Sequence, residues 1–288
     1  MNTKTKNIYL IDGNSLCYRA FYAIRELKTK EGLPTNAVYG FTVSLTKILR
    51  MKKPDYIGVA FDLPEPTFRH KEFASYKANR PKMPDDLIVQ FPILKEVILA
   101  FNIPIFELGG YEADDILATL AKGGEKQGFD VFVMSPDKDL LQIVTDNIRI
   151  IRPIKGDTVF DKEMVCKKYG VEPEKLVDIA ALGGDRSDNV PGVPGIGEKT
   201  ASKLVKQFGD LEGVLKNIDK IPNEKIRKNL SQFSQQAELS RRLVCLKADV
   251  PVKICWEDCA TEVFRENFDK SKVNRLFAEL GFNKLILT

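Results

Sequence analysis

The chain has 288 residues, 43% of them hydrophobic and 29% charged, which is enough for one large domain or for a core with a smaller appendage. Its formal net charge of +4 is too small for a general binder of polyanions, so a surface for nucleic acid would require local segregation of charge. The chain has one histidine, which excludes His-rich metal clusters and zinc sites of the HExxH type.

The sequence carries no signal for export or for membrane insertion. Its first residues lack the apolar segment and the cleavage site of a secretory signal peptide, and no apolar run is long enough to span a bilayer. Its five cysteines are an odd number and lack the spacing of a disulfide framework or a zinc site. We therefore expect a cytoplasmic protein with reduced thiols and no membrane partner.

Predicted strands and helices alternate along the first half of the chain. Short apolar runs predict buried strands at residues 8–11, 56–61, 103–106 and 131–134. Apolar residues at helical spacing predict helices at residues 39–51, 87–101 and 113–122. This alternation is typical of an α/β fold in which a parallel sheet is flanked by helices on both faces. Residues 148–151 and 158–160 are expected to add an edge hairpin.

Two segments interrupt this alternation. Residues 64–84 combine basic and aromatic side chains between prolines, and residues 176–288 contain helical patterns without strands. We therefore predict a domain boundary near residue 175, with an α/β core at residues 1–175 and a helical subdomain at residues 176–288.

Acidic residues follow each of the four predicted strands. They are, in chain order, Asp12, Asp62, the group Glu112, Asp114 and Asp115, and the pair Asp137 and Asp139. Because ligands of open α/β sheets bind at the carboxyl ends of the strands, we expect these side chains to converge on one rim. Asp185 and Asp188 lie just beyond, in a glycine-rich turn.

So many carboxylates cannot remain ionised together without a counter-charge. Oxygen ligands without histidine or thiolate favour Mg²⁺ or Mn²⁺ over Zn²⁺, and a site this rich in acids suits two ions about 3.5–4 Å apart. The alternative for any single acid is a helix N-cap or a solvated turn, and Asp137 could cap a helix at residues 138–144. The pattern across all four strand ends favours a metal site.

The glycine-rich turn reads GVPGIGEKT and is not a Walker A loop, because Glu198 separates Gly197 from Lys199. It predicts a tight hairpin that opens a helix at residues 198–208, and amides in such a turn can hold one phosphate without reading a base. Lys199, Lys203 and Lys206 add positive charge along that helix. The alternative is a loop followed by a solvated helix face.

The basic segment at residues 64–84 could bind single strands, because aromatic faces stack on bases while Lys and Arg follow phosphates. Its basic residues are Arg69, Lys71, Lys77, Arg80 and Lys82, and its interleaved aromatic residues are Phe68, Phe73 and Tyr76. The alternative is a solvated loop. His70, within this segment, is expected on the solvated surface, and Cys17 in the core.

Six motifs together resemble the 5′-nuclease domains of bacterial DNA polymerases I, within the flap endonuclease superfamily. They are IDGNSLCYRAFYA, FDLPEPTFRHKEFASYKANRP, GYEADDILATLA, SPDKDLLQ, GDRSDNVPGVPGIGEKTA and FAELGF. The resemblance covers nearly the whole chain. It implies a PIN-like α/β core, a helical arch at about residues 64–84 and a helix–hairpin–helix module at about residues 185–209.

The resemblance also assigns roles to residues. It implies one metal cluster made of Asp12, Asp62, Glu112 and Asp114, completed by Asp115, and a second made of Asp137, Asp139, Asp185 and Asp188. Tyr76, Lys77 and Arg80 match the YKxNR element of the arch. Tyr76 would stack on a displaced base, and the two cations would steady the phosphate. For DNA contacts it implies Arg19, Arg69, the hairpin glycines Gly192, Gly195 and Gly197, and Lys199 and Lys203. The family's hairpin can also hold a K⁺ ion.

The implied activity is that of a Mg²⁺-dependent 5′→3′ exonuclease and 5′-flap endonuclease that leaves 5′-phosphates. Its partners would be DNA with a 5′ flap, a nick or a 5′ end, and RNA primers in hybrids, during primer removal and repair. Two other functions stay open: a non-catalytic clamp for DNA junctions, and a PIN-type ribonuclease. The sequence does not decide between a stand-alone nuclease and part of a longer polymerase, and a monomer is the default expectation.

Overall fold

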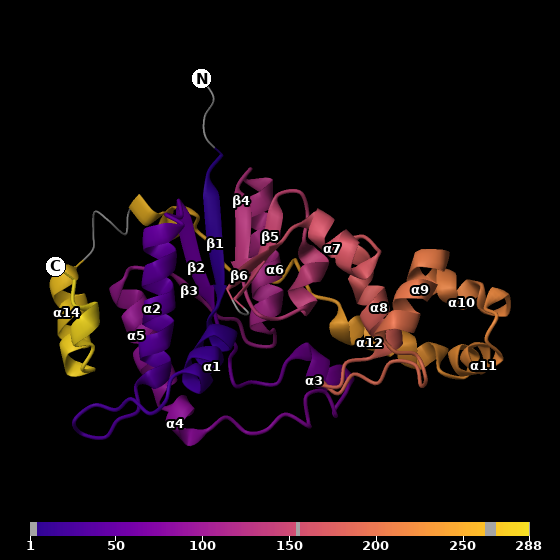
Figure 1. Cartoon of the computed structure of the whole chain (residues 1–288), viewed down its shortest axis with the longest axis horizontal. Coiled ribbons are helices and arrows are strands. Elements are labelled where there is room, and N and C mark those ends of the chain that lie inside the picture. The colour runs from indigo at the N-terminus through magenta and orange to yellow at the C-terminus, as the bar shows by residue number, and fades with distance from the viewer. Residues whose placement is uncertain (1–4, 154–155, 263–268, 288) are drawn as a thin grey trace.

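The computed structural model describes residues 5–153, 156–262 and 269–287, and Figure 1 shows the arrangement of its elements. A sheet with the strand order β3-β2-β1-β4-β5-β6 lies at its centre. The strands are β1 (Asn7–Asp12), β2 (Tyr56–Ala60), β3 (Ile105–Phe106), β4 (Asp130–Met134), β5 (Ile148–Pro153) and β6 (Asp157–Phe160). β1 to β5 are parallel, whereas β6 pairs with β5 in antiparallel fashion. The predicted strands and edge hairpin are therefore confirmed.

Helices cover both faces of the sheet. On one face pack α1 (Gly13–Ala23), α2 (Asn36–Met51), α5 (Gln90–Ala100) and α14 (Lys270–Glu279), and on the other packs α6 (Ala113–Lys126). Side chains of β1 alternate between the two cores, so Tyr9 and Ile11 join the first and Ile8 and Leu10 the second. A strand buried on both faces in this way reads as a continuous apolar run, which is why β1 was visible in the sequence.

A second group of helices packs around a core of its own, on the right in Figure 1. It contains α8 (Leu176–Gly183), α9 (Glu198–Phe208), α10 (Leu211–Lys216), α11 (Glu224–Gln232) and α12 (Ser234–Val244). α7 (Lys162–Tyr169) and the 3₁₀ turn η2 (Pro173–Lys175) connect it to the sheet. Further 3₁₀ turns are η1 (Asp139–Ile143), η3 (Ile218–Lys220), η4 (Glu257–Cys259) and η5 (Asn283–Leu285). The helix expected at residues 138–144 is therefore a 3₁₀ turn.

The chain beyond α12 returns to the sheet, which corrects the helical subdomain predicted for residues 176–288. Val250 joins the core under α6, and Thr261 donates its backbone N–H to the carbonyl of Asp55, just before β2. Phe277 of α14 and Phe282 are buried in the core on the opposite face. The apolar side chains of this segment are buried against the sheet layers, so the separate helical group ends at α12.

The expected helical arch is largely non-helical. It contains α3 (Phe68–Glu72), a series of turns and an extended stretch before α4 (Asp85–Ile88). Lys77 has a left-handed backbone with φ of 55°, and Pro81 and Pro84 lack the N–H that a helix requires. Pro92 likewise has no N–H to donate to the carbonyl of Ile88. The helix predicted at 87–101 is therefore interrupted and divides into α4 and α5.

Two further findings complete the fold. No helix in residues 5–153, 156–262 and 269–287 is long and apolar enough to cross a membrane. Cys17 is fully buried, as expected.

Candidate active site

Acidic side chains from four segments line one cavity of about 440 Å³ at the carboxyl ends of the strands. Asp12 ends β1, Asp62 follows β2, and Asp137 follows β4. Glu112 and Asp114 come from the start of α6, where Glu112 is the N-cap. The acids predicted to converge from the strand ends do so, apart from Asp115 and Asp139, which do not line this cavity.

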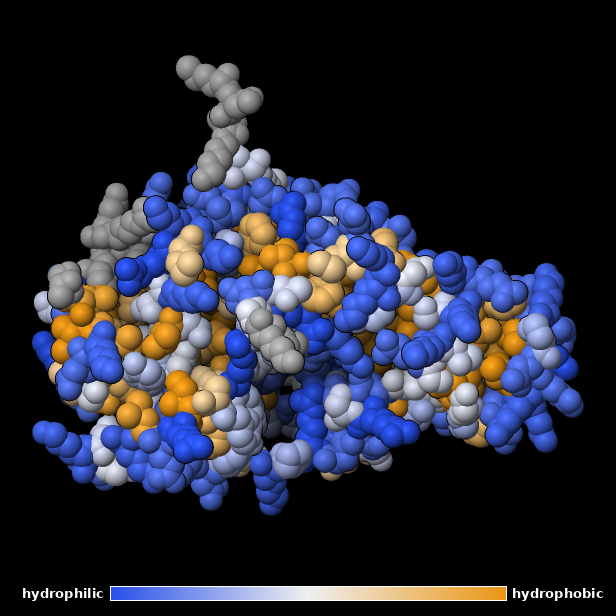
Figure 2. All heavy atoms as spheres, viewed as in Figure 1, coloured by the Kyte–Doolittle hydropathy of each residue, from blue (hydrophilic) through white to orange (hydrophobic). Residues whose placement is uncertain are grey.

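A smaller cavity adjoins the first and brings in three further predicted acids. Asp139, Asp185 and Asp188 line it, together with Glu112 and Asp114, which line both cavities. Asp185 and Asp188 lie between α8 and α9, so the helical group closes this end of the row. In Figure 2 the surface is hollowed below the middle of the molecule, and mainly hydrophilic residues surround the hollow.

Local structure explains the position of the acids at the rim. One oxygen of Asp12 accepts a hydrogen bond of 2.9 Å from the backbone N–H of Ser15, which caps α1. The other oxygen accepts a bond of 2.7 Å from the hydroxyl of Ser135 at the end of β4. Asp62 accepts a bond of 2.7 Å from the N–H of Ala113, which joins the β2 end to the start of α6. Each carboxylate is therefore fixed by a neighbouring segment.

Burial makes the ionised form of several acids costly. Asp62 keeps part of its surface in solvent, but the atoms crowded around the cavity desolvate its carboxyl and raise its pKa to about 6. Burial, reinforced by the charge of Asp137, raises the pKa of Asp139 to about 7. Burial and nearby carboxylates also hold the pKa of Asp114 well above its ordinary value. The site thus contains more negative charge than it neutralises, which is the condition that a bound cation would relieve.

Besides Arg69, which pairs with Glu112 at 3.2 Å, three basic side chains form ion pairs with these acids. Lys77 Nζ lies 2.6 Å from Glu112 Oε1 and 3.8 Å from Asp188 Oδ2. Arg80 pairs with Asp188 at 2.5 Å, and Lys138 pairs with Asp185 at 2.9 Å. Lys138 was not predicted, although its place in the sequence between Asp137 and Asp139, two predicted metal ligands, was a signal for it.

These cations influence the charge state of the site. Burial alone would lower the pKa of Lys77. The charges of Glu112 and Asp188 outweigh this effect, so the pKa of Lys77 is raised and its ammonium group stays charged. Burial alone would raise the pKa of Asp185, but bonds from Ser187 and Lys138 lower it. Within the described residues, no three acidic, histidine or cysteine side chains are placed to hold a metal ion as they stand.

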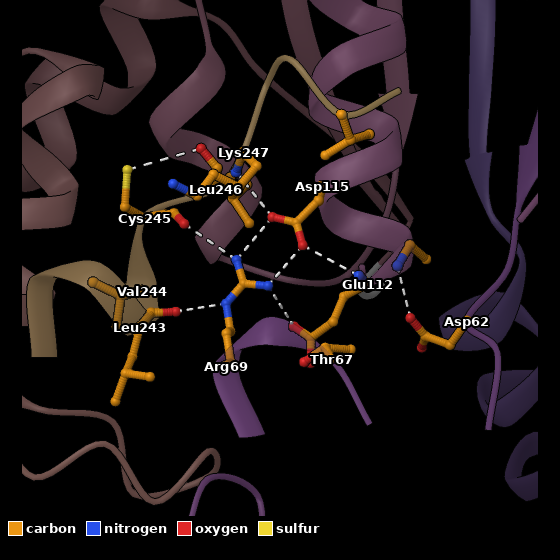
Figure 3. A network of polar contacts seen from close by, with 12 residues as sticks. Asp62, Thr67, Arg69, Glu112, Asp115, Leu243, Val244, Cys245, Leu246 and Lys247 are labelled. Atoms are coloured by element: carbon orange, nitrogen blue, oxygen red, sulfur yellow. Dashed lines mark hydrogen bonds and ion pairs between the residues drawn. The ribbon is translucent and has the colours of Figure 1, made fainter. Parts of the chain in front are cut away.

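Asp115 does not reach the cavity, which corrects its predicted role in the metal centre. It is fully buried, and Figure 3 shows its carboxylate facing the guanidinium of Arg69. The two groups form a double hydrogen bond of 2.6 Å and 2.8 Å. Arg69 is itself only 1% exposed, so the DNA contact predicted for it is wrong as well.

Tyr76 and His70 also differ from expectation. Tyr76 is 4% exposed and packs against the edge of His70, so neither face is free to stack on a base. Its hydroxyl donates to Glu112 at 3.1 Å or to Asp188 at 3.2 Å. His70 is half-buried, and its Nδ1 bonds to Thr67 at the start of α3, so it caps a helix and does not lie on the solvated surface.

Tyr18 is an aromatic residue of the site that the sequence did not reveal. It is half-buried and lines the larger cavity. Its signal was its spacing on α1, because Asp12, Ser15 and Tyr18 follow one another at intervals of three residues and share a helix face.

The hairpin before α9 has the conformation expected of its glycines. Gly192 and Gly195 have φ of 59° and 78°, in the left-handed region. A Cβ on Gly192 would lie 2.3 Å from the backbone nitrogen of Gly184, so only glycine fits there. The backbone N–H of Gly192 donates to Ser240 Oγ at 3.0 Å, which ties the hairpin to α12. Gly197 is the N-cap of α9.

Apart from Arg69, the basic residues predicted to contact DNA are exposed. Lys199 and Lys203 lie on the solvent side of α9, and Arg19 lies on the solvent side of α1. None of the three is within the two acidic cavities. They are therefore free to meet a large ligand, in contrast to Arg69.

Comparison with known proteins gives two family matches. Residues 7–170 match the family described as 5'-3' exonuclease, N-terminal resolvase-like domain, and residues 171–267 match 5'-3' exonuclease, C-terminal SAM fold. DNA polymerase I of Bacillus caldotenax is 46% identical over 284 residues, which cover 98% of this chain and 32% of the polymerase. A 5'-3' exonuclease of Aquifex aeolicus is 45% identical over 281 residues, which cover 98% of this chain and 94% of that protein. The chain therefore spans about a third of the length of the polymerases it matches.

Solved structures share the fold. The T5 5'-exonuclease with bound zinc ions aligns with a TM-score of 0.69 at 20% identity, covering 96% of this chain and 100% of that one. The catalytic core of Rad2 in complex with a DNA substrate aligns with a TM-score of 0.62 at 17% identity, covering 96% and 88%. At such low identity these similarities establish the mixed α/β fold with its flanking helices.

Proposed function

Because the chain belongs to the 5'-3' exonuclease family in both its N-terminal and its C-terminal domain, we propose that it hydrolyses DNA in a Mg²⁺-dependent reaction at junctions between a duplex and a 5′ single strand. The observation that carries this proposal is the set of acids that line the two adjoining cavities at the strand ends. Lys77 and Arg80 line the larger cavity with them and pair with Glu112 and Asp188. A protein that only bound a polyanion would gain nothing from gathering negative charge beside its ligand.

The donor set fits divalent magnesium. All candidate ligands are carboxylates, and desolvation in the cavities disfavours the ionised form of Asp62, Asp114 and Asp139 unless a cation is near. One ion would be held by Asp12, Asp62, Glu112, Asp114 and Asp137, and a second by Asp139, Asp185 and Asp188. When bound, the ions supply Lewis-acid activation of water and neutralise charge on the leaving oxygen. Mn²⁺ shares the preference for carboxylate oxygen and is expected to substitute.

The chain's own side chains would position the substrate. Lys77 and Arg80 would exchange their carboxylate partners for the phosphate, where such cations typically lower the barrier by about 3–4 kcal/mol. The stacking role expected for Tyr76 would fall to Tyr18, because Tyr18 lines the larger cavity whereas Tyr76 is buried. It would stack on the base next to the cleaved bond.

The duplex would lie against the hairpin and α9. The turn places Gly195 and Gly197 at the surface, close in sequence to Lys199 and Lys203, which add charge for phosphates, while Gly192 anchors the turn from inside. Arg19 would contact the strand near the cavity. The hairpin carbonyls of Gly192 and Pro194 each accept one hydrogen bond and keep a second lone pair, with which they could hold K⁺.

These contacts recognise shape and backbone and read no base, so the specificity is for the junction. The substrates would be 5′ flaps, nicks and 5′ ends of DNA, including RNA primers in hybrids, and the products would carry 5′-phosphates. This activity suits primer removal and repair, by a monomer.

A panel of four labelled substrates tests the proposal: a 5′-flap DNA duplex, a blunt duplex, an RNA–DNA hybrid and single-stranded RNA. We expect cuts at the flap junction in Mg²⁺ and none in EDTA, with single-stranded RNA left intact. Tight flap binding without cleavage in Mg²⁺ or Mn²⁺ would instead indicate a clamp. Preferred cleavage of single-stranded RNA would indicate a ribonuclease.

A further inference from the structure

Arg69 uses all of its hydrogen-bonding capacity inside the protein. A guanidinium has five N–H donors, and the structure gives each a partner (Figure 3). Nε donates to the carbonyl of Leu243 at 2.7 Å, and Nη2 donates to the carbonyl of Cys245 at 3.1 Å. The other three bonds go to the carboxylates of Asp115 and Glu112. Arg69 of α3 thus joins the start of α6 to the end of α12.

Asp115 is saturated in the same way. Besides its two bonds to Arg69, it accepts from the backbone N–H of Glu112 at 3.1 Å and of Lys247 at 2.9 Å. A carboxylate has about four acceptor positions, so none remains for a metal ion. This pair is therefore a fixed part of the scaffold beneath the acids.

The two oxygens of Glu112 have different partners. Oε2 accepts from Arg69 Nη1 at 3.2 Å and from the hydroxyl of Tyr76 at 3.1 Å, and both donors are buried. Oε1 pairs with Lys77, which lines the larger cavity. Oε2 is thus held by two buried donors, whereas Oε1 is on the cavity side with a partly exposed partner.

We propose that Arg69 is a positioning residue which, together with Tyr76, fixes Oε2 of Glu112 so that Oε1 is presented to a divalent cation. Lys77 takes that position in the absence of the cation. This inference rests on the proposed function, because it concerns how the chain prepares one of its carboxylates for the metal. It gives Arg69 a role behind the metal site in place of a contact with DNA.

Calorimetric titration of the DNA-free protein with Mn²⁺ tests the proposal directly. Arg69→Lys retains the charge but cannot make five bonds, so Glu112 and Asp115 lose part of their support. We expect Mn²⁺ to bind about tenfold more weakly, as is usual when a partner behind a metal ligand is removed. Affinity for flap DNA in EDTA, measured by fluorescence anisotropy, should stay within about twofold of the wild type if Arg69 makes no contact with DNA.

A matched control separates positioning from general damage. Arg241 also pairs with a buried aspartate, Asp178, at 2.8 Å, but both line a separate cavity that contains none of the acids at the strand ends. Arg241→Lys should therefore leave Mn²⁺ affinity unchanged. Thermal unfolding of both variants shows whether each is folded under the conditions of the titration.

Tyr76→Phe provides a second test should Arg69→Lys fail to fold. It removes the hydroxyl that donates to Oε2 of Glu112 or to Asp188, and it keeps the packing against His70. We expect a smaller weakening of Mn²⁺ binding, about threefold, together with a lower kcat at unchanged KM. Wild-type Mn²⁺ affinity in every folded variant of Arg69 or Tyr76 would overturn the inference. Failure of the wild type to bind Mn²⁺ would instead overturn the proposed function.

Discussion

Lys77 Nζ lies 2.6 Å from Glu112 Oε1, so a residue of the arch neutralises a carboxylate at the start of α6. The contact joins two segments that are 35 residues apart in the sequence. It also places a cation in the acidic cavity, next to the position that the proposed reaction gives to a phosphate. The ion pair therefore links the resting arrangement of the arch to the chemistry of the site.

Replacing Lys77 should separate metal binding from catalysis. Lys77→Gln removes a competitor for Glu112, so Mn²⁺ affinity should be equal to or higher than that of the wild type. The cleavage rate in Mg²⁺ should fall about 10²–10³-fold, because the developing charge on the phosphate loses a donor. Single-turnover cleavage and calorimetry measure the two effects. Lys95→Gln is the matched control, because Lys95 also pairs with a glutamate, Glu107, outside the site, and it should change neither quantity.

The pKa shifts predict how stability depends on pH in the metal-free protein. Burial raises the pKa of Asp139 to about 7, so folding favours its protonated form. The stabilisation that the protonated Asp139 gives to the folded state is fully present below its ordinary pKa of 3.8. The ionised form predominates above about pH 7, so this stabilisation is lost as the pH rises between these two values. Asp62, with its pKa raised to about 6, acts in the same direction.

Asp139→Asn should remove the part of the pH dependence of stability that comes from Asp139. In EDTA the Tm advantage of the variant over the wild type should grow as the pH rises from about 5, where part of the carboxyl's contribution is already lost, to about 8, where the loss is nearly complete. A difference of several degrees is expected, since about 1 kcal/mol shifts the Tm of a chain of this size by roughly 2–4 °C. A lower Tm for Asp139→Asn than for the wild type at the higher pH would show that the carboxylate is not destabilising.

The hairpin glycines should respond unequally to substitution. Gly192 has a φ of 59°, and a Cβ added there would lie 2.3 Å from the backbone nitrogen of Gly184. Gly192→Ala therefore requires the backbone to shift at Gly184, at Gly192 or at both. We expect a loss of at least about 1–3 kcal/mol of unfolding free energy, measured with urea. Gly197→Ala meets nothing within 4 Å and should leave stability nearly unchanged. Equal effects would contradict the close approach of the hairpin to α8.

The lysines of α9 should contribute to DNA affinity through phosphate contacts alone. Replacing Lys199 and Lys203 by alanine should weaken binding equally for unrelated sequences and reduce the salt slope by about one for each residue. Anisotropy titrations in EDTA at several salt concentrations measure this slope. Lys216→Ala, an exposed lysine paired with Glu212 on α10, should leave it unchanged. A change in sequence preference would show that α9 reads bases.

The features that the sequence predicted are those with a local cause. Buried parallel strands appear as apolar runs, and an acid at the end of such a run must lie at the sheet's rim, so Asp12 and Asp62 were placed from their neighbours alone. Arg69 could not be placed in this way. Its partners lie up to 176 residues away, at Glu112, Asp115, Leu243 and Cys245, and no local pattern shows which cation turns inward.

The return of the C-terminal segment to the sheet was hidden for a similar reason. α14 has an amphipathic pattern, which shows that one face is buried but not against which layer it packs. Figure 1 shows it beside α5, far from the helices that precede it in the sequence. The burial of Tyr76 depended likewise on the fold of the arch, because its position follows from contacts with Glu112 and Asp188 that only the tertiary structure creates.

Cleavage of an internally labelled 5′-flap DNA duplex by the wild type, Asp185→Asn and Asp178→Asn tests the central claim most directly. Asp185 lines the acidic row, whereas Asp178 is a buried aspartate of the same helical group that pairs with Arg241 away from it. We predict Mg²⁺-dependent cuts at the junction for the wild type and Asp178→Asn, and a loss of at least about 10²-fold for Asp185→Asn with flap binding retained. Cleavage by Asp185→Asn at the wild-type rate, or cutting that persists in EDTA, would contradict the account.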